Sequence, residues 1–178
     1  MGAAIIMAFP LSKWRFPFKI VNLSANLIYA MKRKEIKALL SDLFTRQSLA
    51  VLATQAPHGP YTTLVGFVAA EDLRHIYFVT SRSTRKYAAL KANPRVSMLI
   101  DSRTNRTSDF RDAVAVTSLG EARETDKEGA KRTVDRYIAK HPHLEDFVMS
   151  PSCALIQVEV EKYIVVTRFQ QVMTLDME

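Results

Sequence analysis

The sequence predicts a mainly β fold: a mostly antiparallel barrel of six to seven strands with a few helices packed outside it. Short apolar or β-branched segments follow one another along the chain, separated by turns or by one short helix. The regular long crossover helices that a parallel sheet requires are absent. The 178 residues, 48% hydrophobic and 24% charged, have the length and composition of one globular domain.

The first half of the body is expected to hold a helix and a hairpin. A helix is expected over 32–46, because apolar residues recur there at the spacing of one helical face: Ile36, Leu39, Leu40, Leu43 and Phe44. The segments 48–55 and 61–69 are apolar, β-branched and aromatic, and the turn cluster 56–60 joins them as a hairpin.

The middle of the chain is expected to place one helix between two strands. The strands cover 75–80 and 95–101, and the helix covers 83–92, where Asn93 and Pro94 end it. The stretch 102–111 is polar and rich in Arg, Asn, Ser and Thr, which indicates a loop.

The last third is expected to begin with a strand over 113–123, in which Gly120 forms a bulge. Thr125 is the expected cap of a helix over 126–140. A short helix and two closing strands complete the prediction, over 144–148, 153–161 and 163–169.

Residues 1–30 differ from the body, which is expected to be one domain over 31–178. The segment contains no acidic residue, and its apolar run is too short for a membrane span. A clear amphipathic helix opens directly after Met31. We therefore expect 1–30 to be a disordered extension or the result of a start placed too early. An ordered or membrane-touching extension and a transit peptide are the alternatives.

The net charge of +7 does not mark the body as a nucleic-acid binder. Six of the 25 basic residues and none of the 18 acidic residues lie in 1–34, so the remainder holds 19 basic against 18 acidic residues. We expect neither a nucleic-acid nor a membrane partner. The single cysteine, Cys153, excludes an internal disulfide, is expected to be buried, and favours a reducing, cytoplasmic compartment.

The segment between the third strand and the next helix has the chemistry of a phosphate site. The unpaired N–H groups and the dipole of a helix N-terminus favour an anion. Hydroxyls and cations gather at this point: Thr80, Ser81, Arg82, Ser83, Thr84, Arg85 and Lys86. The alternative is that Ser83 or Thr84 only caps the helix while the cations are solvated.

Two stretches carry a family resemblance: Tyr77–Lys86, which ends a strand and opens a helix, and Leu90–Ser97 with its Asn-Pro-Arg-Val-Ser. On these residues, the sequence from Leu49 to Asp101 resembles the pyridoxamine-phosphate-oxidase-like, FMN-binding split-barrel flavoproteins. A weaker likeness continues to about Phe169. The resemblance implies a split β-barrel that forms a homodimer with two FMN sites at the subunit interface.

The resemblance also implies which residues hold the cofactor. Those on the ribityl-phosphate are Thr80, Ser81, Thr84, Arg85 and Lys86. The backbone of the second strand lies beside the isoalloxazine ring, at Thr63, Leu64, Val65 and Gly66. Gly66 allows a close approach, or else marks a barrel bulge. Asn105, with Arg103, is expected to reach the partner's flavin from the polar loop.

This chain departs from the pyridoxamine phosphate oxidases proper. Thr63 and Val68 stand where those enzymes carry an Arg and a Lys beside the ring. The C-terminal Arg-x-His element that binds their vitamin substrate, pyridoxamine phosphate, is also absent. We therefore expect an FMN-binding member of the superfamily without the vitamin-oxidase activity. No side chain is assigned a catalytic role. His141 and His143 lack a third ligand, so no metal site is predicted.

The resemblance implies an FMN-dependent oxidoreductase. It would transfer hydride or electrons to or from an unknown small substrate, with NAD(P)H as a candidate donor. Two alternatives stay open: a flavin- or haem-binding protein without turnover, and a reductase that uses the deazaflavin F420 on the same fold. His58 and His75 are not obvious axial ligands for haem.

Overall fold

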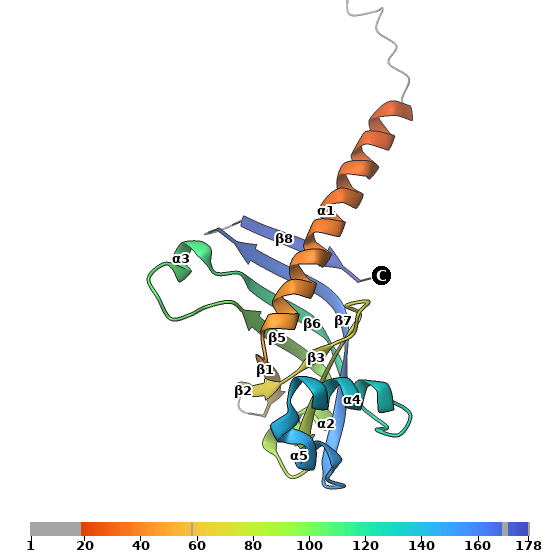
Figure 1. Ribbon diagram of the computed structural model, residues 1–178, viewed down its shortest axis with the longest axis vertical. Coiled ribbons are helices and arrows are strands. Elements are labelled where there is room, and N and C mark those ends of the chain that lie inside the picture. Colours follow the sequence, from red (N-terminus) through yellow and green to blue (C-terminus); the bar gives the residue numbers. More distant parts are fainter. Residues whose placement is uncertain (1–18, 58, 169–170, 178) are drawn as a thin grey trace, which may run out of the picture.

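One antiparallel sheet forms the body of the protein, and helices flank it (Figure 1). The computed structural model describes residues 19–57, 59–168 and 171–177, of which 19–31 are described by their backbone alone. The strands are β1 (Leu49–Ala56), β2 (Gly59–Gly66), β3 (Val68–Ala69), β4 (His75–Ser81), β5 (Arg95–Asp101), β6 (Ala115–Thr125), β7 (Cys153–Thr167) and β8 (Gln171–Asp176). The helices are α1 (Lys19–Arg46), α2 (Arg85–Ala92), α3 (Asp109–Asp112), α4 (Lys131–Lys140), the 3₁₀ turn η1 (Pro142–Leu144) and α5 (Glu145–Met149).

The sheet confirms the predicted fold class, a mainly β antiparallel half-barrel with flanking helices. Across the sheet the strands follow the order β2-β1-β5-β6-β7-β4-β3, and β8 pairs with β7 beyond this path. The predicted hairpin is β1 with β2, in register from Leu49 opposite Gly66 to Ala56 opposite Gly59. Among the described strands, β3 and β4 join the rest of the sheet only through β7.

The end of the chain differs from the prediction. The strands expected over 153–161 and 163–169 are one strand, β7, and Phe169 lies outside the described residues. The polar pair Glu161–Lys162 is not a break. The pairing of β7 with β6 shifts there and Glu161 is the extra residue, so the strand continues through a bulge. The strand β8, which the sequence did not predict, then pairs with β7.

The bulge expected at Gly120 is found at this position of the β6–β7 pairing, although the extra residue, Glu161, belongs to β7 and not to the strand of Gly120. The register between β6 and β7 shifts between Leu119 and Gly120. A Cβ at Gly120 would lie 2.1 Å from the carbonyl oxygen of Glu159 on β7. Because that oxygen belongs to the backbone of the neighbouring strand and cannot move aside, no residue with a side chain fits at this position.

Two helices begin at other residues than expected. α1 runs from Lys19, so the helix continues through part of the segment expected to be a disordered extension, while residues 1–18 lie outside the described residues. α4 begins at Lys131, and Thr125 does not cap it. Gly129 interrupts the expected helix, since its N–H donates to Asp126 Oδ2 at 2.8 Å in a preceding turn. None of the described helices is long and apolar enough to cross a membrane.

The inner face of the sheet carries the core, and α1 covers it (Figure 1). The expected apolar face of residues 32–46 is confirmed, since four of its five members are buried and Leu39 packs against them. Fully buried side chains of α1 and of the sheet's inner face share this core, among them Leu40, Leu43, Leu52, Phe78, Met98 and Tyr163. Burial of this apolar surface is the main force that holds α1 on the sheet.

The outer face of the sheet is apolar and remains in part exposed. One cross-strand row, which we call the outer row, runs over five strands through Leu64, Val51, Leu99, Thr117 and Ile164. Leu64 is 63% exposed, and Leu49 and Val172 on the same face are more than half exposed. Such a contiguous apolar surface is typical of an interaction site.

Candidate functional site

The turn between β4 and α2, residues 80–86, is built as the sequence predicts. β4 ends at Ser81, α2 begins at Arg85, and Thr84 is its N-cap. The N–H of Tyr87 donates to Thr84 Oγ1 at 3.3 Å, which satisfies one of the N–H groups that a helix start leaves unpaired. The remaining N–H groups of this first turn point away from the helix body and favour an anion.

Hydroxyl groups fix the shape of this β4–α2 turn. Thr84 donates to the carbonyl oxygen of Ser81 at 2.9 Å, and its Oγ1 lies 3.1 Å from that of Thr80. Thr80 is buried beneath the turn. Ser81 Oγ lies 2.9 Å from Ser83 Oγ and accepts the N–H of Ser83 at 3.3 Å. The hydroxyls of Ser81 and Ser83 are therefore the outermost of the group.

The three cations of the turn have different surroundings. Arg82 donates to Glu124 Oε1 at 2.5 Å and to the carbonyl oxygen of Pro151 at 2.5 Å, so its charge is compensated within the chain. Glu124 also accepts the hydroxyl of Tyr87 at 2.6 Å; this bond and, more weakly, Arg82 lower the pKa of Glu124 against the opposing effect of burial. Arg85 and Lys86 form no ion pair or side-chain hydrogen bond within the described part of the chain.

The strand β2 is the other half of the predicted site, and it lies at the edge of the sheet. Thr63 and Val65 point toward the interior, while Leu64 between them belongs to the outer row. Thr63 Oγ1 is the one buried side-chain polar atom without a hydrogen-bond partner among the described residues. A buried hydroxyl without a partner is costly, so its partner is expected to come from outside this chain.

Two side chains of α4 and its end hold the junction between β2 and β3. The Tyr137 hydroxyl donates to the carbonyl oxygen of Gly66 at 3.0 Å, and His141 Nε2 lies 3.0 Å from that of Phe67. A carbonyl only accepts, so Nε2 carries the proton. A Cβ at Gly66 would lie 2.9 Å from the Tyr137 hydroxyl, so the close approach at this glycine is that of Tyr137.

Tyr137 connects the two halves of the site. Its hydroxyl also receives the backbone N–H of Val79, directly before Thr80 on β4. Burial raises the pKa of Tyr137 to about 12, against the smaller effect of Val79. Burial also lowers the pKa of His141, although its bond to Phe67 acts in the opposite direction. Both side chains are therefore neutral at physiological pH and have structural roles.

Sequence reasoning did not identify Tyr137 and His141 as parts of the site. The sequence does carry one signal for them. Val134, Tyr137 and His141 are spaced i, i+3 and i+7, which is one helical face, and all three are buried. Nothing in that spacing indicates which strand the face meets, because this is decided by the path of the whole chain.

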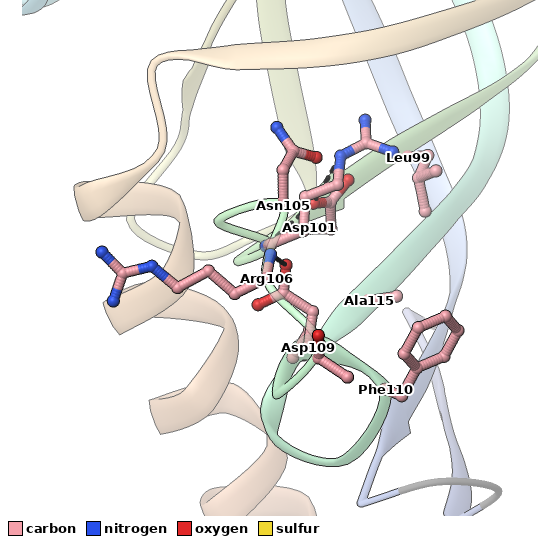
Figure 2. Close-up of a pocket in the computed structure, with 10 residues that line it drawn as sticks. Leu99, Asp101, Asn105, Arg106, Asp109, Phe110 and Ala115 are labelled. Atoms are coloured by element: carbon pink, nitrogen blue, oxygen red, sulfur yellow. Dashed lines mark hydrogen bonds and ion pairs between the residues drawn. The ribbon is translucent and has the colours of Figure 1, made fainter.

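The loop between β5 and β6 forms a separate hollow of about 700 Å³ (Figure 2). Asp109 holds the loop together, since it accepts the N–H groups of Thr104 at 2.8 Å and Arg106 at 3.1 Å. Although desolvation acts to raise the pKa of Asp109, these hydrogen bonds bring it below its usual value. Phe110 is three-quarters exposed and lies beside Ala115 in this view.

The structure does not bring Asn105 to the β4–α2 turn of its own chain. Asn105 lines the loop hollow with a positive φ of 61°, a conformation that asparagine tolerates. Figure 1 shows the loop before α3 and the helix α2 at opposite ends of the sheet. Leu99 lines the same hollow and belongs to the outer row, so the hollow adjoins the exposed apolar face.

Of the described histidines, only His141 and His143 lie close together, with ring centroids 6.4 Å apart. His141 is buried and bonded to Phe67, His143 is exposed, and His58 lies outside the described residues. Within the part of the chain that the structure describes, no three His, Cys, Asp or Glu side chains are grouped to hold a metal ion. Cys153 is buried at the start of β7 opposite Ser81.

A sequence profile of one protein family matches most of this chain. The family is described as Pyridoxamine 5′-phosphate oxidase, and the match covers residues 33–167. That range includes both halves of the candidate site, the loop hollow and α4. A comparison with curated proteins finds no match.

Solved structures share the fold at low sequence identity. The haem-binding protein of Mycobacterium smegmatis is 14% identical with a TM-score of 0.65, over 73% of this chain and 53% of that one, so this chain spans about half its length. HutZ, the haem storage protein of Vibrio cholerae, is 16% identical with a TM-score of 0.62, over 74% and 93% of the two chains. A FAD-binding protein of Mesorhizobium loti is 19% identical with a TM-score of 0.58, over 72% and 90%.

Proposed function

Because this chain belongs to the pyridoxamine 5′-phosphate oxidase family, we propose that it is an FMN-binding flavoprotein that acts as an oxidoreductase on a small molecule. The observation that carries the proposal is the β4–α2 turn. It offers a capped helix start, two outward hydroxyls and two cations, Arg85 and Lys86, that no acid of the described chain compensates. These groups suit a terminal phosphate with close to two negative charges.

The residues present fit FMN in both halves of the site. For the phosphate we propose Ser81, Arg85 and Lys86 as direct contacts, with Thr80 and Thr84 holding the shape of the turn. For the ring we propose the strand residues Thr63, Leu64, Val65 and Gly66, together with the unpartnered Thr63 hydroxyl. An edge strand has free N–H and C=O groups for the polar rim of a flat ring.

We further propose that the protein is a homodimer and that the second copy covers the outer row. A mostly apolar row that crosses five strands and is in part exposed is the kind of surface that a twofold dimer buries. The loop hollow adjoins this face in each copy. The loop of one copy, with Asn105 and Arg103, is then available to the flavin on the edge strand of the other.

The protein's own part in the reaction is to bind, orient and shield the cofactor. FMN supplies redox chemistry at its isoalloxazine ring when bound. Thr63 and Val68 stand where the vitamin oxidases carry charged side chains, so we propose another small substrate, with NAD(P)H as a candidate electron donor. The buried side chains below β2, including Phe67 and Val65, keep water from the inner side of the strand.

A haem-binding protein is the second candidate, because two structural neighbours are a haem-binding and a haem storage protein. Haem usually needs an axial ligand such as histidine. His141 Nε2 is bonded to Phe67 and the ring is buried, which argues against this residue. The phosphate chemistry of the β4–α2 turn favours FMN over haem, because the two haem propionates carry only carboxylates.

The visible spectrum of the purified full chain tests both candidates. We expect the two-band spectrum of an oxidised flavin, and FMN released on denaturation. NAD(P)H-dependent bleaching would then separate an enzyme from a storage protein. A Soret band in place of the flavin bands favours haem, and a single band typical of a deazaflavin favours F420. A folded protein that is colourless and fails to quench the fluorescence of added FMN contradicts the proposal.

A further inference from the structure

A second hollow lies between the last turn of α1, the strand β3 with the turn after it, and α4. Its volume is about 440 Å³. We call it the α1–α4 hollow. It is lined by Ser41, Phe44, Thr45, Val68, Ala69, Ala70, Glu71, Leu73, Arg136, Ala139 and Lys140. None of these residues belongs to the loop hollow, and only Val68 among them is a position that the family resemblance places beside the flavin ring.

Two cations of α4, one helical turn apart, face this hollow. Lys140 Nζ donates to the carbonyl oxygen of Phe44 at 2.7 Å and lies 4.1 Å from the ring centroid of Phe67, which is fully buried. Arg136 Nη2 donates to the carbonyl oxygen of Ala69 at 2.7 Å. A lysine has three N–H donors and an arginine five, so donors remain for an acceptor in the hollow.

The positive charge of the hollow is weakly compensated. Its one carboxylate, Glu71, lies 4.0 Å from Arg136 and 3.9 Å from the neighbouring Arg132, and its side chain is 78% exposed. Within the described residues, no carboxylate lies at ion-pair distance from Lys140. Burial lowers the pKa of Lys140 to about 8, and the charge of Arg136 acts in the same direction. An anion between the two cations would relieve this repulsion.

We propose that the α1–α4 hollow binds a small organic oxyanion, with its carboxylate or phosphate between Arg136 and Lys140 and a short apolar body against the walls. The walls fit such a body, since Phe44, Val68 and Leu73 are apolar and buried. Ser41 and Thr45 on α1 add hydroxyl groups at the rim. The proposal goes beyond the flavin site and does not depend on it.

Isothermal titration calorimetry on the full chain tests the proposal with hexanoate, hexyl phosphate and hexanol as probes. We expect saturable binding of at least one of the two anions, and binding of hexanol at least about tenfold weaker, because only the anions engage both cations. The stronger of the two anions identifies the headgroup. If neither anion binds saturably, or if hexanol binds as tightly, the proposal is wrong.

Three variants locate the site. Lys140→Met should weaken anion binding by about tenfold or more, and Glu71→Gln should tighten it a few-fold because it removes the competing carboxylate. Lys131→Met is the matched control: it makes the same substitution on the same helix, but Lys131 is exposed, forms no ion pair within the described residues and does not line the hollow, so affinity should change less than about twofold. Equal effects of Lys131→Met and Lys140→Met would mean that only the net charge of the chain matters, and would overturn the proposal. Glu71→Gln alters an exposed side chain only, so it remains informative if Lys140→Met folds poorly.

Discussion

The β4–α2 turn and the strand β2 differ in how many of their side chains find hydrogen-bond partners or burial within this chain. In the turn, the hydroxyls of Thr80 and Thr84 bond to each other, Thr84 also bonds to the backbone of Ser81, and the Ser81 hydroxyl bonds to Ser83. The shape of the turn is therefore complete without a ligand. In β2, Thr63 Oγ1 has no partner and Leu64 is largely exposed. The first region is made by seven consecutive residues. The second leaves groups without partners, and we propose that the cofactor and a second copy of the chain supply those partners.

This difference separates binding strength from site assembly. A preformed turn with two uncompensated cations holds an anion without rearranging, so we assign it most of the affinity. The edge strand β2 is stabilised by any group that pairs with its free polar atoms or covers Leu64. We therefore propose that β2 couples cofactor binding to dimer formation. Changes in the turn should therefore lower affinity and leave assembly intact, while changes in β2 should affect both.

The largest expected effect is that of Arg85→Ala with Lys86→Ala. Each lost charge-assisted contact costs about 1.5–3 kcal/mol, so FMN affinity should fall more than about a hundredfold. Quenching of FMN fluorescence measures it. The control is Lys131→Ala with Arg132→Ala, a basic pair that opens α4 as the first pair opens α2. Unchanged FMN affinity in the double variant of α2 would contradict the phosphate assignment.

Leu64→Glu should come next, because it places a charge at the edge-strand end of the outer row, on its most exposed member. Loss of a buried leucine costs about 1.5–3 kcal/mol, so the dimer should dissociate about ten- to a hundredfold more readily. Analytical ultracentrifugation measures the equilibrium. Phe147→Glu, at an exposed apolar residue on α5, serves as the control. A monomeric wild-type chain would rule out the proposed dimer.

Thr63→Val tests whether the hydroxyl of Thr63 bonds to the cofactor or to a group within the chain. Without ligand, the variant should be more stable than wild type by about 1 kcal/mol, because an unpaired buried hydroxyl is removed. Its FMN affinity should fall several-fold if the hydroxyl bonds to the cofactor. Chemical denaturation and FMN titration give the two values. Thr62→Val, at the exposed neighbour, should change neither; a less stable Thr63→Val variant would mean that the hydroxyl has a partner within the chain.

The smallest effect should come from Tyr137→Phe, which loses the bond that joins the two halves, about 0.5–1 kcal/mol of stability. The pKa of Tyr137 is raised to about 12 in the folded chain from 10.0. The folded state therefore keeps the proton longer than the unfolded state, and stability falls as the pH rises from 10 to 12. Tyr163, whose pKa is also raised by burial, adds to this fall. The variant should lose less stability over that interval; denaturation curves at pH 9 and 11 compare them.

The parts of the fold set by local pattern could be predicted. The hairpin β1–β2 and the N-cap at Thr84 each depend on a few adjacent residues with one physical reason. The local sequence pattern gave a wrong prediction where pairing with a strand far away in the sequence determines the structure. Glu161–Lys162 has the polarity of a break, but pairing with β6 carries β7 through it. The helical sequence pattern begins at residue 126, but Gly129 lies in a turn, so the helix α4 begins only at Lys131.

The candidate site divides in the same way. The chemistry of residues 80–86 is contiguous in sequence, so it could be identified from the sequence. The roles of Tyr137 and Glu124 could not be, since each acts on residues far away in the chain: Tyr137 on Gly66, and Glu124 on Arg82. The sequence also does not reveal that the charge of Arg85 is uncompensated. This is known only from the structure, in which Glu124 forms its ion pair with Arg82.

The central position of β7 has a consequence for how the protein is made. The strand pairs with β4, β6 and β8, and β4 has no other long partner among the described strands. During synthesis the ribosome releases β4 and the start of α2 well before residues 153–159, which must pair with β4. The nascent chain therefore carries an open strand edge until residues 153–159 emerge, and chaperones that bind such edges should engage it in this interval.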